Sequence, residues 1–384
     1  MIYEPILEEL KSREVYLYDR YAPYYISSFA CHVFNLHNQK SEVYYEAKEI
    51  PSLRMHILFV APPGFMKSFY MKQFLQGKYA IFRNVGVPIG FENTLTEAGF
   101  VGTVKEIGGE IITIEGAAQL YSEGILGIDE FSAITKALQQ QHSSQLDTQL
   151  LAALDHGNVY KRLGMGKIDF QTNLTLWAGV QPARFDLTSG LGRRFIYLVF
   201  FPTRAESDEL LASWWKSKNK KPAQHEIEKL RVKIRKFKQD MSKVKKLEFS
   251  DDVLNEYRRL GLYPFEGTYF DRLLIGYHLA AYGPDYKITI STKDRELRKL
   301  INFELEWRRA VMLDAEMIQI AKMIESFGGK VRRSVLFDEC TMLGLDIRKV
   351  SQILEGMRRY GLLLVHEDML ILRNSNRKDS RNHG

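Results

Sequence analysis

Residues 56–68 read HILFVAPPGFMKS, an apolar run followed by a Pro-Gly turn, a lysine and a serine. Such a run predicts a buried strand, and the residues after the turn begin a helix. Backbone N–H groups at a helix start bind phosphate oxygens, the lysine reaches the outer phosphates and the serine hydroxyl binds Mg²⁺. The stretch therefore predicts an ATP-binding loop made of Pro63, Gly64, Phe65, Met66, Lys67, Ser68 and Phe69.

This loop departs from the pattern GxxxxGK[ST] of phosphate-binding loops, because Ala61 and Met66 stand at the two glycine positions. A second motif supports it. An apolar run ends at Asp129 and Glu130, which predicts a strand that terminates in two carboxylates. In P-loop ATPases such an Asp holds Mg²⁺ and the adjacent Glu polarises the attacking water. An ordinary solvated turn after a strand is the alternative.

Two further polar residues are associated with later apolar runs. Gln181 follows the run 174–179 and is able to hydrogen-bond the terminal phosphate or the attacking water; a plain loop amide is the alternative. Arg194 begins the run 194–201. At the edge of a subunit this arginine would enter the neighbour's site as an arginine finger. We prefer Arg194 to the adjacent Arg193, and the assignment predicts a homo-oligomer.

The apolar runs 56–60, 124–128, 174–178 and 194–201 alternate with helical stretches. Buried parallel strands have this pattern, so we predict an α/β fold with a parallel sheet. Near the C-terminus, three helical patterns and an apolar hairpin predict a winged helix-turn-helix. The expected segments are an N-terminal helical cap at 1–50, an α/β ATPase core at 51–202, a helical lid at 203–312, the winged helix at 313–373 and a disordered tail at 374–384.

Composition restricts the class of protein. Of the 384 residues, 45% are hydrophobic and 26% are charged, which is typical of a globular chain. No apolar run is long enough for a membrane-spanning helix, and the first residues do not resemble a secretory signal. Cys31 and Cys340 lie far apart and form no disulfide or zinc pattern. We therefore expect a cytoplasmic protein, and the net charge of +7 is compatible with a polyanionic partner such as DNA.

The order of these motifs resembles the AAA+ ATPase domain of the minichromosome-maintenance (MCM) replicative helicases. The matching pieces are SLRMHILFVAPPGFMKS (52–68), TEAGFVGTV (96–104), EGAAQL (115–120), GILGIDEF (124–131), LLAALDHG (150–157), AGVQP (178–182) and Arg194-Phe195. The resemblance implies a hexameric ring that uses ATP and Mg²⁺ to move along or unwind DNA in replication, and so short a relative would suit a virus, plasmid or other mobile element. The N-terminal half of that family has no counterpart here, and Gln181 stands where the family has asparagine.

The same family carries hairpins that face DNA, and cations on such hairpins contact the phosphate backbone. Here they would be an insertion after Val104 and a second hairpin over 159–168. The resemblance also implies that Arg272, on a lid helix, is a second sensor of the γ-phosphate, with a surface Asp-Arg pair as the alternative. The expected DNA contacts are Lys105, Lys161, Arg162 and Lys167 on the hairpins, and Arg348 and Lys349 on the recognition helix of the winged helix.

Three functions stay open at this point. The first is an ATP-driven DNA translocase or helicase, and the second is a remodeller of protein partners similar to the MoxR-like chaperones. The third is a nucleotide-dependent DNA-binding initiator or regulator with little hydrolysis, which Met66 and Gln181 leave open. A winged helix suits either DNA binding or protein docking. The basic segment 216–246 is either a solvated helix face or a nucleic-acid contact.

Overall fold

The computed structural model describes most of the chain. The described residues are 1–44, 53–131, 146–155, 157–163, 166–181, 194–218, 220–262, 264–311, 315–359 and 362–372. Contacts divide the chain into two compact units, which we call unit 1 (Met1–Val199 and Ser213–Trp307) and unit 2 (Phe200–Ala212 and Arg308–Gly384). Unit 1 therefore combines most of the residues expected in a cap, a core and a lid. The tail at 374–384, expected to be disordered, lies outside the described residues.

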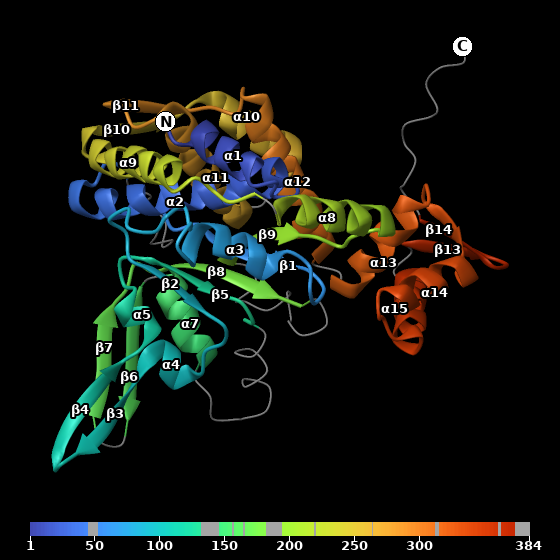
Figure 1. Cartoon of the computed structure of the whole chain (residues 1–384), viewed down its shortest axis with the longest axis horizontal. Helices are drawn as coiled ribbons and strands as arrows, with labels where there is room; N and C mark the ends of the chain where they lie inside the picture. The colour runs from blue at the N-terminus through green and yellow to red at the C-terminus, as the bar shows by residue number, and fades with distance from the viewer. Residues whose placement is uncertain are drawn as a thin grey trace. The chain divides into compact units, whose positions relative to one another are not determined.

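A five-stranded parallel sheet lies at the centre of unit 1 (Figure 1). Its strands, in spatial order, are β2 (Ile89–Glu92), β5 (Ile125–Ile128), β8 (Thr175–Val180), β1 (His56–Val60) and β9 (Phe195–Val199). All neighbouring strands run parallel. Every residue of β1, β5, β8 and β9 is buried, which explains their continuous apolar runs. The prediction of an α/β fold with a parallel sheet is confirmed, whereas β2 was not predicted.

Helices and short elements surround this sheet. Those of unit 1 are α1 (Tyr3–Ser12), α2 (Tyr18–Ser41), α3 (Lys67–Leu75), α4 (Glu97–Val101), α5 (Ala117–Leu120), α7 (Leu146–Asp155), α9 (Gln224–Asp240), a 3₁₀ turn (Met241–Lys243), β10 (Lys246–Phe249), α10 (Asp251–Leu260), α11 (Pro264–Tyr282) and β11 (Lys287–Ile290). Helices α8 (Arg204–Ser217) and α12 (Arg295–Val311) include residues of both units. Across the described ranges, no helix has the length and apolar character needed to cross a membrane.

Aromatic rings join helix α2 to the sheet. Tyr25 meets Trp177 on β8 edge-on, with ring centroids 4.8 Å apart, and Phe29 stacks on Phe82 at 4.0 Å. Trp177 also donates its indole N–H to Ser28 Oγ at 2.8 Å. Aromatic pairs at such separations stabilise a core beyond the area that they bury. The N-terminal helix α2 is therefore part of the hydrophobic core of unit 1.

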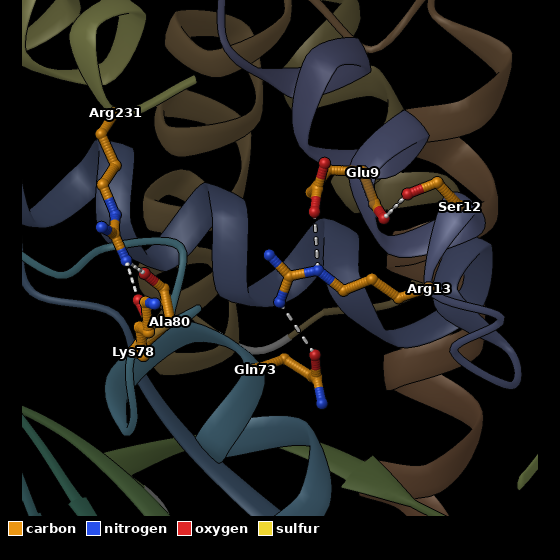
Figure 2. A network of polar contacts seen from close by, with 7 residues as sticks. All are labelled: Glu9, Ser12, Arg13, Gln73, Lys78, Ala80 and Arg231. Carbon is orange, nitrogen blue, oxygen red and sulfur yellow. Dashed lines mark hydrogen bonds and ion pairs between the residues drawn. The ribbon is translucent and has the colours of Figure 1, made fainter. Parts of the chain in front are cut away.

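A buried arginine joins α1 to α3 (Figure 2). Arg13 donates to the carboxylate of Glu9 at 2.8 Å and to the side-chain oxygen of Gln73, on α3, at 3.1 Å. Helix α3 begins at the predicted ATP-binding loop. The N-terminal segment is thus bound directly to the helix that carries Lys67.

The basic row of α9 binds the loop that follows α3. Arg231, Arg235 and Lys238 lie about one turn apart on the helix, and all three donate to backbone carbonyls within residues 78–86. Figure 2 shows Arg231 donating to two of these carbonyls, at 2.8 and 2.6 Å. This part of the basic segment 216–246 is therefore packed against the protein and is not a solvated face.

Two antiparallel hairpins lie side by side in unit 1 (Figure 1). The first pairs β3 (Gly102–Ile107) with β4 (Glu110–Glu115), and the second pairs β6 (Asn158–Leu163) with β7 (Gly166–Gln171). Both lie where the sequence predicts hairpins. Strand β4 is exposed along its whole length, so the first hairpin is covered by few other residues of its own chain.

Unit 2 has a hydrophobic core of its own. Its elements after α12 are α13 (Ala315–Ser326), β12 (Lys330–Arg332), α14 (Arg333–Met342), α15 (Ile347–Arg359), β13 (Leu363–His366) and β14 (Met369–Leu372). The strands form an antiparallel sheet in the order β12-β14-β13. Buried side chains such as Leu336, Leu354 and Leu370 pack between the helices and the sheet. The order of three helices followed by a hairpin is the predicted one, whereas β12 was not predicted.

A buried histidine makes the stability of unit 1 depend on pH. His32 on α2 lies within hydrogen-bond distance of Thr175 Oγ1, at 2.9 Å, and of the carbonyl of Glu123, at 3.1 Å. Burial lowers the pKa of His32 from 6.5 to about 4, because the imidazolium ion is poorly solvated in the core. The folded chain therefore holds His32 in its neutral form.

We expect the free energy of unfolding to fall as the pH drops from 6.5 to about 4. In this interval the unfolded chain binds a proton at His32 that the folded chain does not bind, which favours unfolding by about 3 kcal/mol in total. Urea unfolding, followed by circular dichroism at several pH values in this interval, measures the loss. A His32→Gln variant should lose part of this pH dependence, and retention of the full dependence would assign it to other groups.

Candidate functional site

The predicted ATP-site residues lie at the carboxyl ends of three adjacent strands. The loop with Lys67 and Ser68 follows β1, Gln181 follows β8, and Asp129 and Glu130 follow β5. Strand β8 lies between β1 and β5, and all three strands are parallel. Their carboxyl ends therefore meet at one edge of the sheet, where open α/β sheets bind ligands.

The loop before α3 turns through two residues with positive φ. Gly64 has a φ of 81° and Met66 a φ of 53°. Glycine adopts this conformation without strain, whereas Met66 adopts it at a cost. Within the described part of the chain, the backbone N–H groups of Gly64 and Met66 have no hydrogen-bond partner. With Pro63 and Phe65 they form a turn that presents unpaired N–H groups at a helix start, which suits an anion.

Lys67 is buried at the start of α3. Its ammonium donates to the carbonyls of Ala61 and Pro62 at 2.7 and 2.8 Å. Burial lowers the pKa of Lys67 to about 8, and the carboxylates of Glu130 and Asp129 partly oppose this shift. The lysine therefore lies close enough to both carboxylates for its charge to respond to them.

Ser68 and Asp129 would hold a metal ion. Ser68 donates its hydroxyl hydrogen to Asp129 Oδ1, so the two side chains present oxygen atoms to the same point. Oxygen donors of this kind suit Mg²⁺, which takes few protein ligands and is bound largely through phosphates and water. Among the residues that the structure describes, no three His, Cys, Asp or Glu side chains gather into a metal site. The next residue, Phe69, is 40% exposed.

Glu130 and Gln181 form the second polar pair of the site. Gln181 Nε2 donates to Glu130 Oε1 at 2.9 Å. The backbone at the end of β5 is also fixed, because the N–H groups of Asp129 and Glu130 donate to the carbonyls of Glu92 and Asn93, both at 2.9 Å. This arrangement orients a carboxylate that is able to accept a proton from water.

Arg194 lies at the opposite end of the sheet from this site. It directly precedes β9, and the next residue, Phe195, pairs with His56 at the start of β1. One strand length, about 15 Å, separates it from the loop after β1, so Arg194 does not reach phosphates bound in its own chain. Its guanidinium forms an ion pair with Asp155, at the end of α7, at 2.5 Å. The finger role of Arg194 stays a prediction and requires a neighbouring subunit.

Arg272 on α11 also lies away from Lys67. Burial lowers the pKa of Arg54 to about 9, and the charge of Arg272 is the next largest cause. Arg272 is therefore near the amino end of β1, which Arg54 precedes. It is 7% exposed and lies over the Tyr269 ring at 5.2 Å, and its Nε atom has no partner among the described residues. Contact with a γ-phosphate stays a prediction for this residue too.

The four hairpin cations expected at DNA differ in their surroundings. Lys105, Arg162 and Lys167 are exposed. Lys161 instead forms an ion pair with Glu97, on α4, at 2.6 Å, and the two side chains are only 16% and 24% exposed. Lys161 therefore fixes the second hairpin to α4, and three cations are left exposed on the two hairpins.

In unit 2 the expected DNA contacts lie at the start of α15. Arg348 and Lys349 are both exposed in its first turn. Arg358, near the end of the same helix, is bound by both of its donors to Glu355 at 2.9 Å. The two expected contacts are thus exposed at the start of α15, and the exposed Arg358 near its end is ion-paired.

Comparison with known proteins identifies no family for this chain. No protein-family model matches the sequence, and a search of curated proteins also found no match. The geometry at the ends of β1, β5 and β8 is therefore the main support for any functional proposal.

Sequence reasoning missed several residues that position the site. Glu97 and Asp155 form the ion pairs with Lys161 and Arg194, and Glu92 and Asn93 hold the backbone of the carboxylates. The two residues of each of these contacts are dozens of residues apart in the sequence, so no local pattern connects them. The alternation along β6 is the one sequence signal for these contacts, because it places the side chain of Lys161 on the opposite face of the strand from those of Tyr160 and Arg162.

Gly64 provides a test of the loop. A Gly64→Ala substitution introduces no clash, because no atom lies within 4 Å of the new Cβ, but the φ of +81° strains the alanine. We expect the strain of about 1–2 kcal/mol to raise the Kd for Mg-ATP about 5- to 30-fold, measured by calorimetric titration. Gly267→Ala, on α11, is the control and should leave the Kd unchanged. An unchanged Kd in Gly64→Ala would contradict a role of this turn in phosphate binding.

Proposed function

We propose that this chain is an Mg²⁺-dependent ATPase of the AAA+ class. One observation carries the proposal: Lys67, Ser68, Asp129, Glu130 and Gln181 meet at one edge of the parallel sheet. Hydrogen bonds join Ser68 to Asp129 and Gln181 to Glu130. Phosphoryl transfer to water needs a cation at the phosphates, oxygen ligands for Mg²⁺, and a base for the water. These side chains meet all three needs.

Each side chain has a separate task in this proposal. Lys67 exchanges its bonds to the loop carbonyls for bonds to phosphate oxygens, which stabilise its charged form. Ser68 and Asp129 would hold Mg²⁺, whose charge would offset that of the phosphates. Glu130 accepts a proton from the attacking water, and Gln181 orients Glu130 through its 2.9 Å hydrogen bond.

The position of Arg194 supports a ring of subunits. Arg194 lies near the amino end of β1, whereas Lys67 lies beyond its carboxyl end. Arg194 reaches a phosphate only if the amino-end side of one subunit faces the carboxyl-end side of the next. Such a head-to-tail contact closes into a ring when its rotation allows. We propose a homohexamer similar to the MCM ring.

We propose DNA as the polymer on which this ring acts. Lys105, Arg162 and Lys167 are exposed on the hairpins, and Arg348 and Lys349 are exposed on α15 in unit 2. Cations placed this way bind phosphates without reading the sequence. The proposed function is ATP-driven translocation along DNA, or its unwinding, in replication.

Hydrolysis by the purified chain, with and without DNA, tests the proposal. We expect hydrolysis that requires Mg²⁺ and that increases with single-stranded or forked DNA. DNA binding should weaken steeply with salt, because bound lysines and arginines release counterions. An equal rate of hydrolysis with and without DNA would contradict the translocase. Nucleotide binding without hydrolysis would favour an initiator or regulator. Particle images with a non-hydrolysable nucleotide and forked DNA test the ring.

Strand β4 favours a second candidate, a remodeller of protein partners. Ile111, Ile112 and Ile114 on this strand are 60%, 41% and 39% exposed. Clustered apolar side chains on a surface mark contacts with other proteins. Hydrolysis stimulated by an unfolded polypeptide, and not by DNA, would support this candidate over the first.

A further inference from the structure

One face of the hairpin β6–β7 is exposed along its whole length. Residues paired across an antiparallel hairpin point to the same side, and their neighbours along each strand point to the other. We call the exposed side the outer face. Its paired residues are Asn158 with Gln171, Tyr160 with Asp169, and Arg162 with Lys167, all exposed. The inner face carries Val159 and Ile168, which are 1% and 3% exposed, and the ion-paired Lys161.

Tyr160 lies at the centre of the outer face. Its side chain is 47% exposed, and it makes no ring–ring contact within the described ranges. Arg162 Nε donates to its hydroxyl at 2.9 Å. The buried side chain of Gln149, on α7, donates to its backbone carbonyl at 2.7 Å. The strand is therefore held in place from behind, while the aromatic ring stays accessible.

The composition of the outer face matches a nucleic acid better than a protein. It has one aromatic ring, two cations, two amides and one carboxylate, that of Asp169, and it contains no aliphatic side chain. Protein docking sites are centred on apolar anchors in desolvated pockets. Non-specific sites for single strands instead combine cations along the backbone with aromatic rings on which bases stack. In a duplex the base faces are already covered, so stacking selects an unpaired strand.

We propose that Tyr160 stacks on an unpaired base of a single-stranded nucleic acid while Arg162 and Lys167 bind its phosphates. The inference rests on the proposed function in one respect, namely that the hairpins face a nucleic acid. It adds the strand preference and the residue responsible for it. Lys161 belongs to the support of the hairpin through Glu97, and Lys167 has only a weak, exposed partner in Asp169 at 3.3 Å.

Fluorescence anisotropy with the full chain tests the stacking. The probes are a labelled oligo-dT and a strand of equal length whose sugars carry no bases. We expect Tyr160→Ala to weaken oligo-dT binding about 5- to 150-fold, and to leave binding of the abasic strand unchanged. Tyr160→Phe, which keeps the ring, should bind oligo-dT within about twofold of wild type. Oligo-U and duplex probes separate RNA and paired DNA from single-stranded DNA.

Salt dependence separates stacking from charge. The slope of log affinity against log salt should fall by about 1 in Arg162→Gln and stay unchanged in Tyr160→Ala. Equal binding of oligo-dT by Tyr160→Ala and wild type would overturn the inference, and so would an equal loss with the abasic strand or tighter wild-type binding to duplex. If the wild-type chain binds none of the probes, the proposed function itself is contradicted, because the stacking would then have no strand to act on.

Discussion

Replacing Glu130 by glutamine is expected to slow ATP hydrolysis by about 10²- to 10⁴-fold. Glutamine has the shape of glutamate but accepts no proton at neutral pH, so the substitution removes the general base alone. Its side-chain oxygen still accepts the hydrogen bond that Gln181 donates at 2.9 Å. Because Lys67, Ser68 and Asp129 are unchanged, Mg-ATP should bind with nearly wild-type affinity.

Phosphate release and calorimetric titration with Mg-ATP measure these two quantities. Glu123→Gln is the matched control, since it makes the same change at an exposed residue before β5 rather than after it. The control should hydrolyse ATP at the wild-type rate. If Glu130→Gln keeps more than about a tenth of that rate, Glu130 is not the base. If the Glu130→Gln variant also loses ATP binding, the substitution has damaged the binding loop. That result would contradict the assignment of Glu130 to hydrolysis alone.

Replacing Arg54 by methionine is expected to lower the free energy of unfolding of unit 1 by about 3 kcal/mol. Arg54 is 1% exposed and donates to the carbonyls of Leu174, Leu154 and Thr172 at 2.7, 3.1 and 3.4 Å. In the sequence, Leu154 precedes the hairpin β6–β7, and Thr172 and Leu174 follow it. Methionine fills much of the volume but removes the donor from the carbonyls of Leu174 and Thr172, at about 1–3 kcal/mol each, whereas the carbonyl of Leu154 keeps His56 Nε2 at 3.2 Å. The release of a buried charge offsets part of that cost.

Urea unfolding at neutral pH measures this change. Arg235→Met on α9 is the matched control, because Arg235 is only partly buried and donates to a single carbonyl, that of the exposed residue Asn84. The control should change the free energy of unfolding by less than about 0.5 kcal/mol. A loss below about 1 kcal/mol in Arg54→Met would show that water or neighbouring groups replace the guanidinium, contrary to the geometry.

The residues of the candidate site were selected from local patterns. Lys67 and Ser68 follow a strand and a Pro-Gly turn, and Asp129 and Glu130 end an apolar run, so each signal occupies only a few consecutive residues. Such patterns are visible because burial on both faces of a parallel strand requires continuous apolar residues. The α/β class follows from the same runs.

Elements that lack a continuous apolar run are not predictable in this way. Strand β2 has only four residues, and its burial is incomplete, so no run marks it. The basic row on α9 has the pattern of a solvated face, yet it donates to carbonyls within residues 78–86. A row of cations has the same sequence pattern whether it contacts water, phosphates or backbone carbonyls.

Local patterns were thus sufficient to predict the four fully buried strands and to select the polar residues at their ends, since side-chain burial leaves a periodic trace in the chain. The meeting of Ser68 with Asp129 and of Gln181 with Glu130 depends instead on β8 lying between β1 and β5. The placement of Arg194 at the other end of the sheet depends on the register of β9 with β1. Spatial strand order and register arise from contacts between distant segments, which no local pattern specifies.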